Sequence, residues 1–147
     1  MPTEFSITRR VQFAETDMAG VMHFSNYFRW MEEVEHAFFR SLDMSIVQKH
    51  DGGTISFPRV RVTCEYFAPA HFEDVIEVKL LVTDMSEKSI VWEAEFVRGG
   101  KRVARGQVKM VCCQMDGSKF SSISIPDFIR AKLEEGTGGS RDGGSGG

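Results

Sequence analysis

Disulfide and metal-binding patterns are absent from this chain of 147 residues. Its three cysteines, Cys64, Cys112 and Cys113, form neither an even disulfide set nor the spacing of a metal site. Cys112 and Cys113 are adjacent, so in a strand their side chains would point to opposite faces. Three histidines show no metal-ligand spacing with each other or with the cysteines: His36, His50 and His71. We therefore expect reduced, mostly buried thiols and no metal ion.

Other absences each exclude a class of protein. No window reaches the ~18 apolar residues of a membrane span, and the N-terminal segment MPTEFSITRR lacks the apolar stretch of a signal peptide. The formal net charge of −3 lacks the basic excess of a nucleic-acid-binding protein. No glycine-rich phosphate loop of the Rossmann or Walker type is present, and we predict no cofactor. These absences favour a soluble, cytoplasmic protein with no nucleic-acid or membrane partner.

Apolar residues, by contrast, are plentiful. Hydrophobic residues make up 41% of the chain, and twelve Phe and eight Met suggest a core or pocket with adaptable walls. The length favours one domain that needs no disulfide or metal for stability. We assign residues 1–135 to this domain. Residues 136–147, GTGGSRDGGSGG, form a Gly/Ser-rich tail that cannot bury enough surface to fold.

Hydrophobic spacing predicts a first strand over residues 5–14 and then one long helix over residues 25–42. Apolar residues of the helix recur at three- and four-residue steps, at Tyr27, Trp30, Met31, Val34, Ala37, Phe38 and Leu42. Polar residues take the remaining face: Arg29, Glu32, Glu33, Glu35, His36 and Arg40. Phe28 and Phe39 widen the apolar stripe, so we expect the helix to be enclosed on more than one side.

After Pro58 the hydrophobic period changes to two. Four successive segments alternate apolar and polar residues: RVRVTCEYF, DVIEVKLLVTD, SIVWEAEFV and RVARGQVKMVCC. Such segments predict an antiparallel sheet that is half-buried. The glycines and proline of HDGGTISFP predict a loop before the sheet, and SIPDFIRAKLEE predicts a short terminal helix. We therefore predict an α+β fold in which an antiparallel sheet wraps around the long helix.

The turn ETDMAGVMHFSNYFRWMEE joins the first strand to the helix. Together with CEYFAPAHFEDVIEV and EKSIVWEAEFV, it resembles the hotdog-fold acyl-CoA thioesterases, and most closely their 4-hydroxybenzoyl-CoA thioesterase branch. The most specific part is Asp17 and Gly20, followed by Asn26 and Tyr27 at the start of the helix. The resemblance implies a homodimer or homotetramer with active sites at a subunit boundary. It also implies that Asp17 is the catalytic carboxylate and that the backbone N–H of Phe24 polarises the thioester carbonyl.

The chemistry of thioester hydrolysis suits these residues. A helix N-terminus offers unpaired N–H groups and a positive dipole end to the carbonyl oxygen, where negative charge develops. Gly20 permits close backbone approach. Asp17 can attack the carbonyl carbon or draw a proton from water, and the two routes stay open. A thiolate leaves readily, since the pKa of a thiol is about 8.5.

Each candidate residue also has a purely structural interpretation. Asp17 can have the purely structural role of forming the turn. Glu15 is a less favoured candidate than Asp17 for the catalytic carboxylate. His23 is a candidate catalytic residue or a hydrogen-bonded structural one, because some relatives carry a histidine one position later. Asn26 can cap the helix or hold the Asp17 turn, and Tyr27 can line the substrate site or the core. No metal ligand is assigned.

The resemblance also implies a basic position that binds the nucleotide of coenzyme A. In this sequence the position corresponds to Lys88, and Ser89 beside it is a further substrate-binding candidate. Neighbouring arginines of the family correspond to Ser86 and Glu87. An ordinary solvated hairpin is the structural interpretation of Lys88.

We predict an acyl-CoA thioesterase that hydrolyses an aromatic or short-to-medium-chain acyl thioester. The alternatives are a hotdog hydratase or dehydratase, which needs a histidine and an acid from different segments, and a non-catalytic acyl-CoA-binding protein. Asp17 beside Gly20 favours the thioesterase.

Overall fold

The computed structural model describes residues 5–138, with side chains to residue 135. One long helix, α1 (Ser25–Ser41), follows a first strand and a 3-10 turn, β1 (Phe5–Arg10) and η1 (Phe13–Glu15). Two short strands and four long ones come next, namely β2 (Gln48–His50), β3 (Gly53–Ser56), β4 (Arg59–Tyr66), β5 (Val75–Met85), β6 (Ser89–Arg98) and β7 (Lys101–Val111). The remaining elements are β8 (Cys113–Asp116), β9 (Lys119–Ser122) and α2 (Asp127–Gly138).

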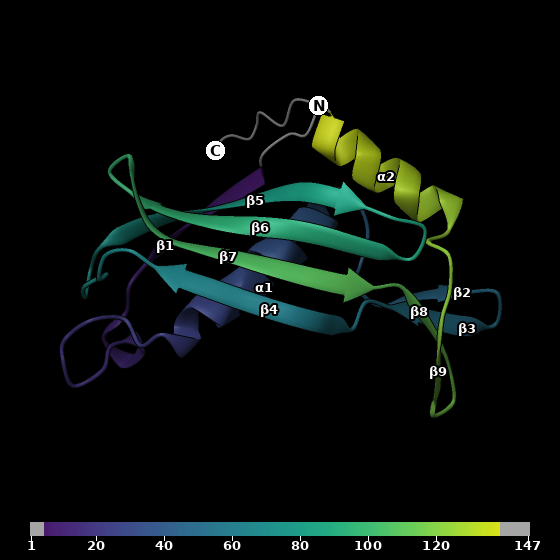
Figure 1. Ribbon diagram of the computed structural model, residues 1–147, viewed down its shortest axis with the longest axis horizontal. Helices are drawn as coiled ribbons and strands as arrows, with labels where there is room; N and C mark the ends of the chain where they lie inside the picture. Colours follow the sequence, from purple (N-terminus) through teal and green to yellow (C-terminus); the bar gives the residue numbers. More distant parts are fainter. Residues whose placement is uncertain (1–4, 139–147) are drawn as a thin grey trace.

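The large sheet has the strand order β1-β5-β6-β7-β4, and every neighbouring pair is antiparallel. Figure 1 shows α1 lying across one face of this sheet, and β1 and β4 are its two edge strands. A second sheet of order β2-β3-β8-β9 lies beyond one end of the large sheet. The predicted α+β hotdog architecture, a sheet around a long helix, is therefore confirmed.

The hydrophobic core forms between α1 and the concave face of the sheet. Trp30, Val34 and Phe38 of α1 are almost fully buried, as the helical spacing predicts. Alternate residues of β5, β6 and β7 meet them, at Ile76, Val78, Leu80, Ile90, Trp92, Ala94, Phe96, Val108 and Met110. Ile129 and Leu133 of α2 complete the core at the far end.

Two predictions of local structure were wrong, and two strands were not predicted. The first strand ends at Arg10 rather than residue 14, because η1 follows and the Gln12 N–H donates to the Glu15 side chain at 2.8 Å. The predicted loop, residues 50–58, contains β3 and the last residue of β2, and these two strands pair across the turn at Asp51 and Gly52. The strands β8 and β9 were not predicted, since β9 is exposed throughout and shows no alternation.

Glu35 also departs from the prediction. The helical pattern places it with the polar residues, yet only 1% of its surface is exposed. It faces the sheet, where Arg59 at the start of β4 pairs with its carboxylate.

The two ends of the chain are only partly described. Helix α2 continues to Gly138, so it includes the first residues of the segment predicted as a tail. The rest of that segment, 139–147, lies outside the described residues, as do residues 1–4. Neither helix within residues 5–138 has the length and apolar character needed to cross a membrane.

Candidate functional site

Asp17 begins a tight turn at the tip of a short hairpin. Its carbonyl oxygen accepts the N–H of Gly20 at 2.9 Å, and its own N–H donates to the Val21 carbonyl at 2.9 Å. Gly20 has a φ of +83°, a conformation that favours glycine. The carboxylate Oδ1 of Asp17 accepts the N–H of Ala19 at 2.9 Å and that of Val21 at 3.4 Å. One oxygen thus holds the turn, while Oδ2 makes no hydrogen bond with a described residue.

The hairpin is fastened to the loop between β4 and β5. The N–H of Met22 donates to the Ala70 carbonyl at 2.7 Å, and Val21 forms a β-bridge with His71. Asp74 holds this loop, because its Oδ2 accepts the His71 N–H at 2.8 Å and the Arg98 guanidinium at 2.9 Å. These two partners lower the pKa of Asp74, so its carboxylate is ionised near neutral pH. The position of the Asp17 turn is therefore fixed from both sides.

A cavity of about 380 Å³ opens beside the turn, and we call it the Asp17 cavity. Asp17 is the only acidic residue in its lining. The other lining residues are mainly apolar or aromatic: Val21, Met22, Phe24, Tyr27, Tyr66, Phe67, Ala68 and Pro69. A carboxylate at the mouth of an apolar pocket is a common arrangement of small-molecule sites.

The N-terminal end of α1 borders the same cavity. Phe24 occupies the N-cap position, and its backbone N–H makes no hydrogen bond with a described residue. The Tyr66 hydroxyl donates to the Phe24 carbonyl at 3.1 Å, which links the start of α1 to the end of β4. The Tyr66 ring also packs edge-on against Tyr27, at 4.9 Å between centroids. Burial, with a contribution from Cys64, raises the pKa of Tyr66, so its hydroxyl stays protonated.

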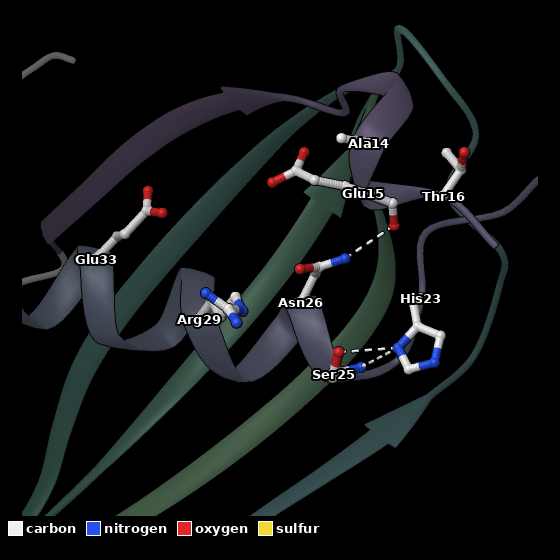
Figure 2. Close-up of a pocket in the computed structure, with 8 residues that line it drawn as sticks. All are labelled: Ala14, Glu15, Thr16, His23, Ser25, Asn26, Arg29 and Glu33. Atoms are coloured by element: carbon white, nitrogen blue, oxygen red, sulfur yellow. Dashed lines mark hydrogen bonds between the residues drawn. The ribbon is translucent and has the colours of Figure 1, made fainter.

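A second, polar cavity of about 560 Å³ lies around the start of α1. Figure 2 shows Asn26 reaching Glu15, whose carbonyl oxygen accepts the Asn26 side-chain amide at 2.8 Å. His23 points toward Ser25, with 2.8 Å between Nδ1 and Oγ. The Glu15 carboxylate receives the Trp30 indole N–H at 3.0 Å and pairs with Arg9 at 3.2 Å. Glu15 therefore has a structural role, which agrees with its being the less favoured candidate for the catalytic carboxylate.

The predicted site residues around the start of α1 fall into two groups. Asp17, Phe24 and Tyr27 line one cavity, with Gly20 in the turn that holds Asp17. His23 and Asn26 line the neighbouring polar cavity instead. Tyr66 was missed as a site residue, and its only sequence signal is its place at the end of an alternating strand.

Lys88 and Ser89 lie at the far end of the sheet. Ser89 pairs with Val111, whereas Phe96 pairs with Ala104, the partner of Tyr66. At roughly 3.3 Å per residue, the seven residues from Ser89 to Phe96 span about 23 Å. A single chain therefore does not bring Lys88 or Ser89 to Asp17. Among the residues that the structure describes, no group of three His, Cys, Asp or Glu side chains could hold a metal ion.

Comparison with known proteins gives a consistent result. The profile of the thioesterase-like superfamily matches residues 11–133. A protein of Aquifex aeolicus (strain VF5) that bears only the general name of an esterase is 34% identical over 131 residues, which cover 89% of this chain and 98% of the relative. The 4-hydroxybenzoyl-CoA thioesterase of Pseudomonas sp. (strain CBS-3) is 24% identical over 140 residues, covering 88% and 97%. The solved structure of a gentisyl-coenzyme A thioesterase is 29% identical, with a TM-score of 0.75 and coverage of 88% and 99%.

Proposed function

The chain belongs to the thioesterase-like superfamily, and on this basis we propose that it hydrolyses the thioester bond of an acyl-coenzyme A. The observation that supports the assignment most directly is the Asp17 cavity. A carboxylate with one uncommitted oxygen and the start of a helix border the same apolar space.

The proposed mechanism uses these two groups on one carbonyl. The N–H of Phe24 donates to the thioester oxygen and stabilises the negative charge that develops there. Oδ2 of Asp17 attacks the carbonyl carbon, or it takes a proton from a water molecule that attacks in its place. The C–S bond then breaks and coenzyme A leaves as a thiolate. In the first route, water cleaves the mixed anhydride on Asp17 and releases the acid. In the second route the acid forms directly, and the proton that Asp17 took passes to the departing thiolate. Gly20 and the hydrogen bonds of the turn hold Asp17 in position throughout.

The remaining candidates have supporting roles in this proposal. Tyr27 forms part of the acyl-binding wall beside Tyr66. Asn26 fixes the start of α1 through its bond to the Glu15 carbonyl. His23 takes no proton-transfer step, because it lines the polar cavity rather than the Asp17 cavity. That separation disfavours the hydratase alternative, which needs a histidine beside the acid.

We propose an aromatic acyl group as the substrate class. The Asp17 cavity is bordered by the rings of Phe24, Tyr27, Tyr66 and Phe67, which suit a flat ring. Two of the relatives named above act on hydroxylated benzoyl thioesters according to their names. The alternative is a short-to-medium aliphatic acyl group, and the rates of hydrolysis of a panel of acyl-CoA thioesters distinguish the two.

The test is release of free thiol from a panel of acyl-CoA thioesters by the wild type and by Asp17→Asn. Asparagine keeps an oxygen that accepts the turn hydrogen bonds, so folding should be preserved. We expect kcat to fall by about 10²–10⁴-fold, the usual contribution of such a group. The matched control is Asp84→Asn, an exposed aspartate of β5, which should keep full activity. Equal turnover by wild type and Asp17→Asn would refute the role of Asp17, and binding without any turnover would favour a non-catalytic acyl-CoA-binding protein.

We also propose that two copies pair through β4 to complete the site. β4 is one of the two edge strands of the large sheet, and 57% of Val60 and 40% of Val62 are exposed. An open edge strand with exposed apolar residues is a template for pairing with another chain. A second copy related by a two-fold axis presents the same strand in the antiparallel direction.

Charge complementarity selects the register of this pairing. Arg61, Thr63 and Glu65 share the outer face of β4, because they pair with the exposed Lys109, Gln107 and Arg105. Residues directly opposite in an antiparallel pair point to the same face. With the two-fold axis at Thr63, Arg61 of each protomer lies opposite Glu65 of the partner subunit, which gives two contacts between opposite charges. Shifting the pairing by two residues in either direction would place Arg61 opposite Thr63 or Phe67 of the partner subunit.

This register brings the end of β4 in one protomer beside the start of β4 in the other. Tyr66, on the wall of the Asp17 cavity, then lies near Arg59 of the partner subunit. The partner subunit's Lys88 and Ser89 lie at the same end of its sheet as its Arg59, because Ile90 and Arg59 both pair with Met110. The homotetramer stays a prediction.

A further inference from the structure

Glu15 closes the hairpin that carries Asp17 at its tip. Its backbone carbonyl oxygen accepts the N–H of His23 at 2.8 Å and the side-chain amide of Asn26 at 2.8 Å, the second of which is drawn in Figure 2. Residues 15–23 therefore form a closed loop whose base is joined to the first turn of α1. A change in the position of Glu15 acts on this whole loop.

The closing contact lies next to both groups of the proposed mechanism. Asp17 follows Glu15 by two residues, and Phe24 follows His23 directly. The bond between the Glu15 carbonyl and the His23 N–H therefore limits how far the Asp17 carboxylate can lie from the Phe24 N–H. These two groups must meet on one thioester carbonyl, and a misplacement of about 1 Å can cost roughly 10²-fold in rate.

The carboxylate of Glu15 connects the same loop to the core. Its Oε1 accepts the N–H of Gln12 at 2.8 Å. Its Oε2 accepts the indole N–H of Trp30 at 3.0 Å and the guanidinium of Arg9 at 3.2 Å. Trp30 is fully buried, and the Arg9 guanidinium lies over its ring at 4.7 Å. One residue thus joins the base of the Asp17 hairpin to β1 and to the second turn of α1.

Both oxygens of the Glu15 carboxylate are needed, because each of them faces a donor. A carboxylate only accepts hydrogen bonds, whereas a glutamine would present one oxygen and one NH₂ group. The N–H of Gln12 or the indole N–H of Trp30 would then face another donor and lose its partner, which costs free energy. The 3-10 turn alone would need only the oxygen that bonds to Gln12. The other oxygen serves the connection to α1.

We propose that Glu15 is a positioning residue for thioester hydrolysis, which holds the Asp17 carboxylate and the Phe24 N–H at the separation that one thioester carbonyl requires. It touches neither the substrate nor the reacting atoms and acts through the backbone of the Asp17 hairpin. This inference depends on the proposed function.

The first experiment measures kcat and KM of Glu15→Gln for 4-hydroxybenzoyl-CoA, benzoyl-CoA and hexanoyl-CoA. We expect kcat to fall by about 10–100-fold, with KM changed by less than about twofold. The factor should be the same for every thioester that the wild type hydrolyses, since Glu15 acts on the reaction centre and not on the acyl group. A purely structural role would lower the thermal unfolding midpoint and leave kcat of the folded protein unchanged, and that result would overturn the inference.

The matched control is Glu33→Gln. Glu33 pairs with the same Arg9, but it makes no hydrogen bond to the Asp17 hairpin among the described residues. This variant should therefore keep the kcat of the wild type. A loss of kcat equal to that of Glu15→Gln would assign the effect to the Arg9 ion pairs and contradict the inference.

A double-mutant cycle tests whether Glu15 acts through Asp17. In the Asp17→Asn background the group that Glu15 positions is already gone, so adding Glu15→Gln should reduce the residual turnover by a much smaller factor. The same factor in both backgrounds would show that the two residues act independently, which the inference forbids.

A second variant covers the case in which Glu15→Gln does not fold. Trp30→Phe keeps a ring in the core and removes only the indole donor to Glu15 Oε2. It should lower kcat by about 2–10-fold, the value of one hydrogen bond, with little change in KM. An unchanged kcat in folded Trp30→Phe would refute the connection through α1.

Amide hydrogen exchange separates failure of this inference from failure of the proposed function. If the wild type hydrolyses none of the three thioesters, the thioesterase assignment fails. The amides of Asp17, Gly20 and His23, each hydrogen-bonded within the hairpin, should still exchange at least about tenfold faster in Glu15→Gln, while those of β6 stay protected. Equal protection of the hairpin amides in both proteins would refute the positioning role.

Discussion

The Tyr66 hydroxyl reaches from the end of β4 to the carbonyl oxygen of Phe24, at 3.1 Å. This bond fixes the peptide that follows the proposed oxyanion donor. The Tyr66 ring also contacts Tyr27, which packs edge-on against Phe96 of β6 at 5.1 Å. Three aromatic residues thus connect the first turn of α1 to the sheet. Tyr66 is a positioning residue in this arrangement, because it acts through the backbone of Phe24.

Tyr66→Phe should lower kcat by about 2–10-fold, the value of one ordinary hydrogen bond, with little change in KM. The ring contact with Tyr27 is kept, so the thermal unfolding midpoint should change by no more than a few degrees. Steady-state kinetics and calorimetry measure both effects. A rise in KM at constant kcat would instead assign Tyr66 to substrate binding.

Single residues were predictable where local geometry determines their position. Asp17 and Gly20 form a turn whose residue types follow from its backbone conformation, and Tyr27 follows from helical spacing. The structural interpretation of Asp17 is confirmed by its bonds to Ala19 and Val21, and its catalytic role stays a prediction. The positions of Glu35 and Tyr66 could not be predicted, since each depends on contacts between distant segments.

At the scale of elements, α1 and β7 approach each other closely at one glycine. A Cβ added to Gly106 would lie 2.3 Å from the sulfur of Met31 and 3.3 Å from the Thr63 carbonyl oxygen. The glycine therefore makes room for the helix against the sheet.

Gly106→Ala should destabilise the fold by about 1–3 kcal/mol, the usual range for overpacking a core. Chemical denaturation measures the free energy of unfolding. Because the methyl group meets Met31, the shorter Leu at position 31 should relieve part of the cost. The double variant Gly106→Ala with Met31→Leu should lose less free energy of unfolding than the two single variants lose when their losses are added. Simple additivity would show that Met31 is not the obstructing group.

Long periodic elements were predicted correctly, and short ones were not. The helix over residues 25–42 and the four alternating segments agree with α1 and β4 to β7, because burial on one face imposes the period. The strands β2, β3, β8 and β9 have three or four residues each, too few for a period to appear. Whether these short segments form strands depends on their pairing in the folded chain, and not on a pattern within each segment.

At the scale of the whole molecule, the proposed dimer depends on complementary charges along β4. Two copies of the contact between Arg61 and Glu65 of the partner subunit flank the two-fold axis. Cross-strand ion pairs contribute roughly 0.2–1 kcal/mol each, and like charges in the same place destabilise by similar amounts. Glu65 also pairs with Arg105 of its own chain at 3.0 Å, so it is already oriented on the outer face.

Arg61→Glu should weaken dimerisation by about tenfold, since it replaces two attractive contacts by two repulsive ones. The combined variant Arg61→Glu with Glu65→Arg restores opposite charges and should recover most of the affinity. Analytical ultracentrifugation gives the dissociation constants. The control Lys101→Glu makes a change of the same sign at the exposed first residue of β7, which lies eight residues along the strand from Lys109, the neighbour of Arg61. Equal dimer affinity in all these proteins would exclude this register.

The two oxygens of Asp17 differ in their surroundings, and this asymmetry has a chemical consequence. If Oδ2 becomes acylated, Oδ1 remains a carbonyl oxygen and continues to accept the N–H groups of Ala19 and Val21. If Oδ2 only receives a proton, the same is true. The loop can thus keep one shape in every state of a turnover cycle, and no rearrangement of the hairpin need limit the rate.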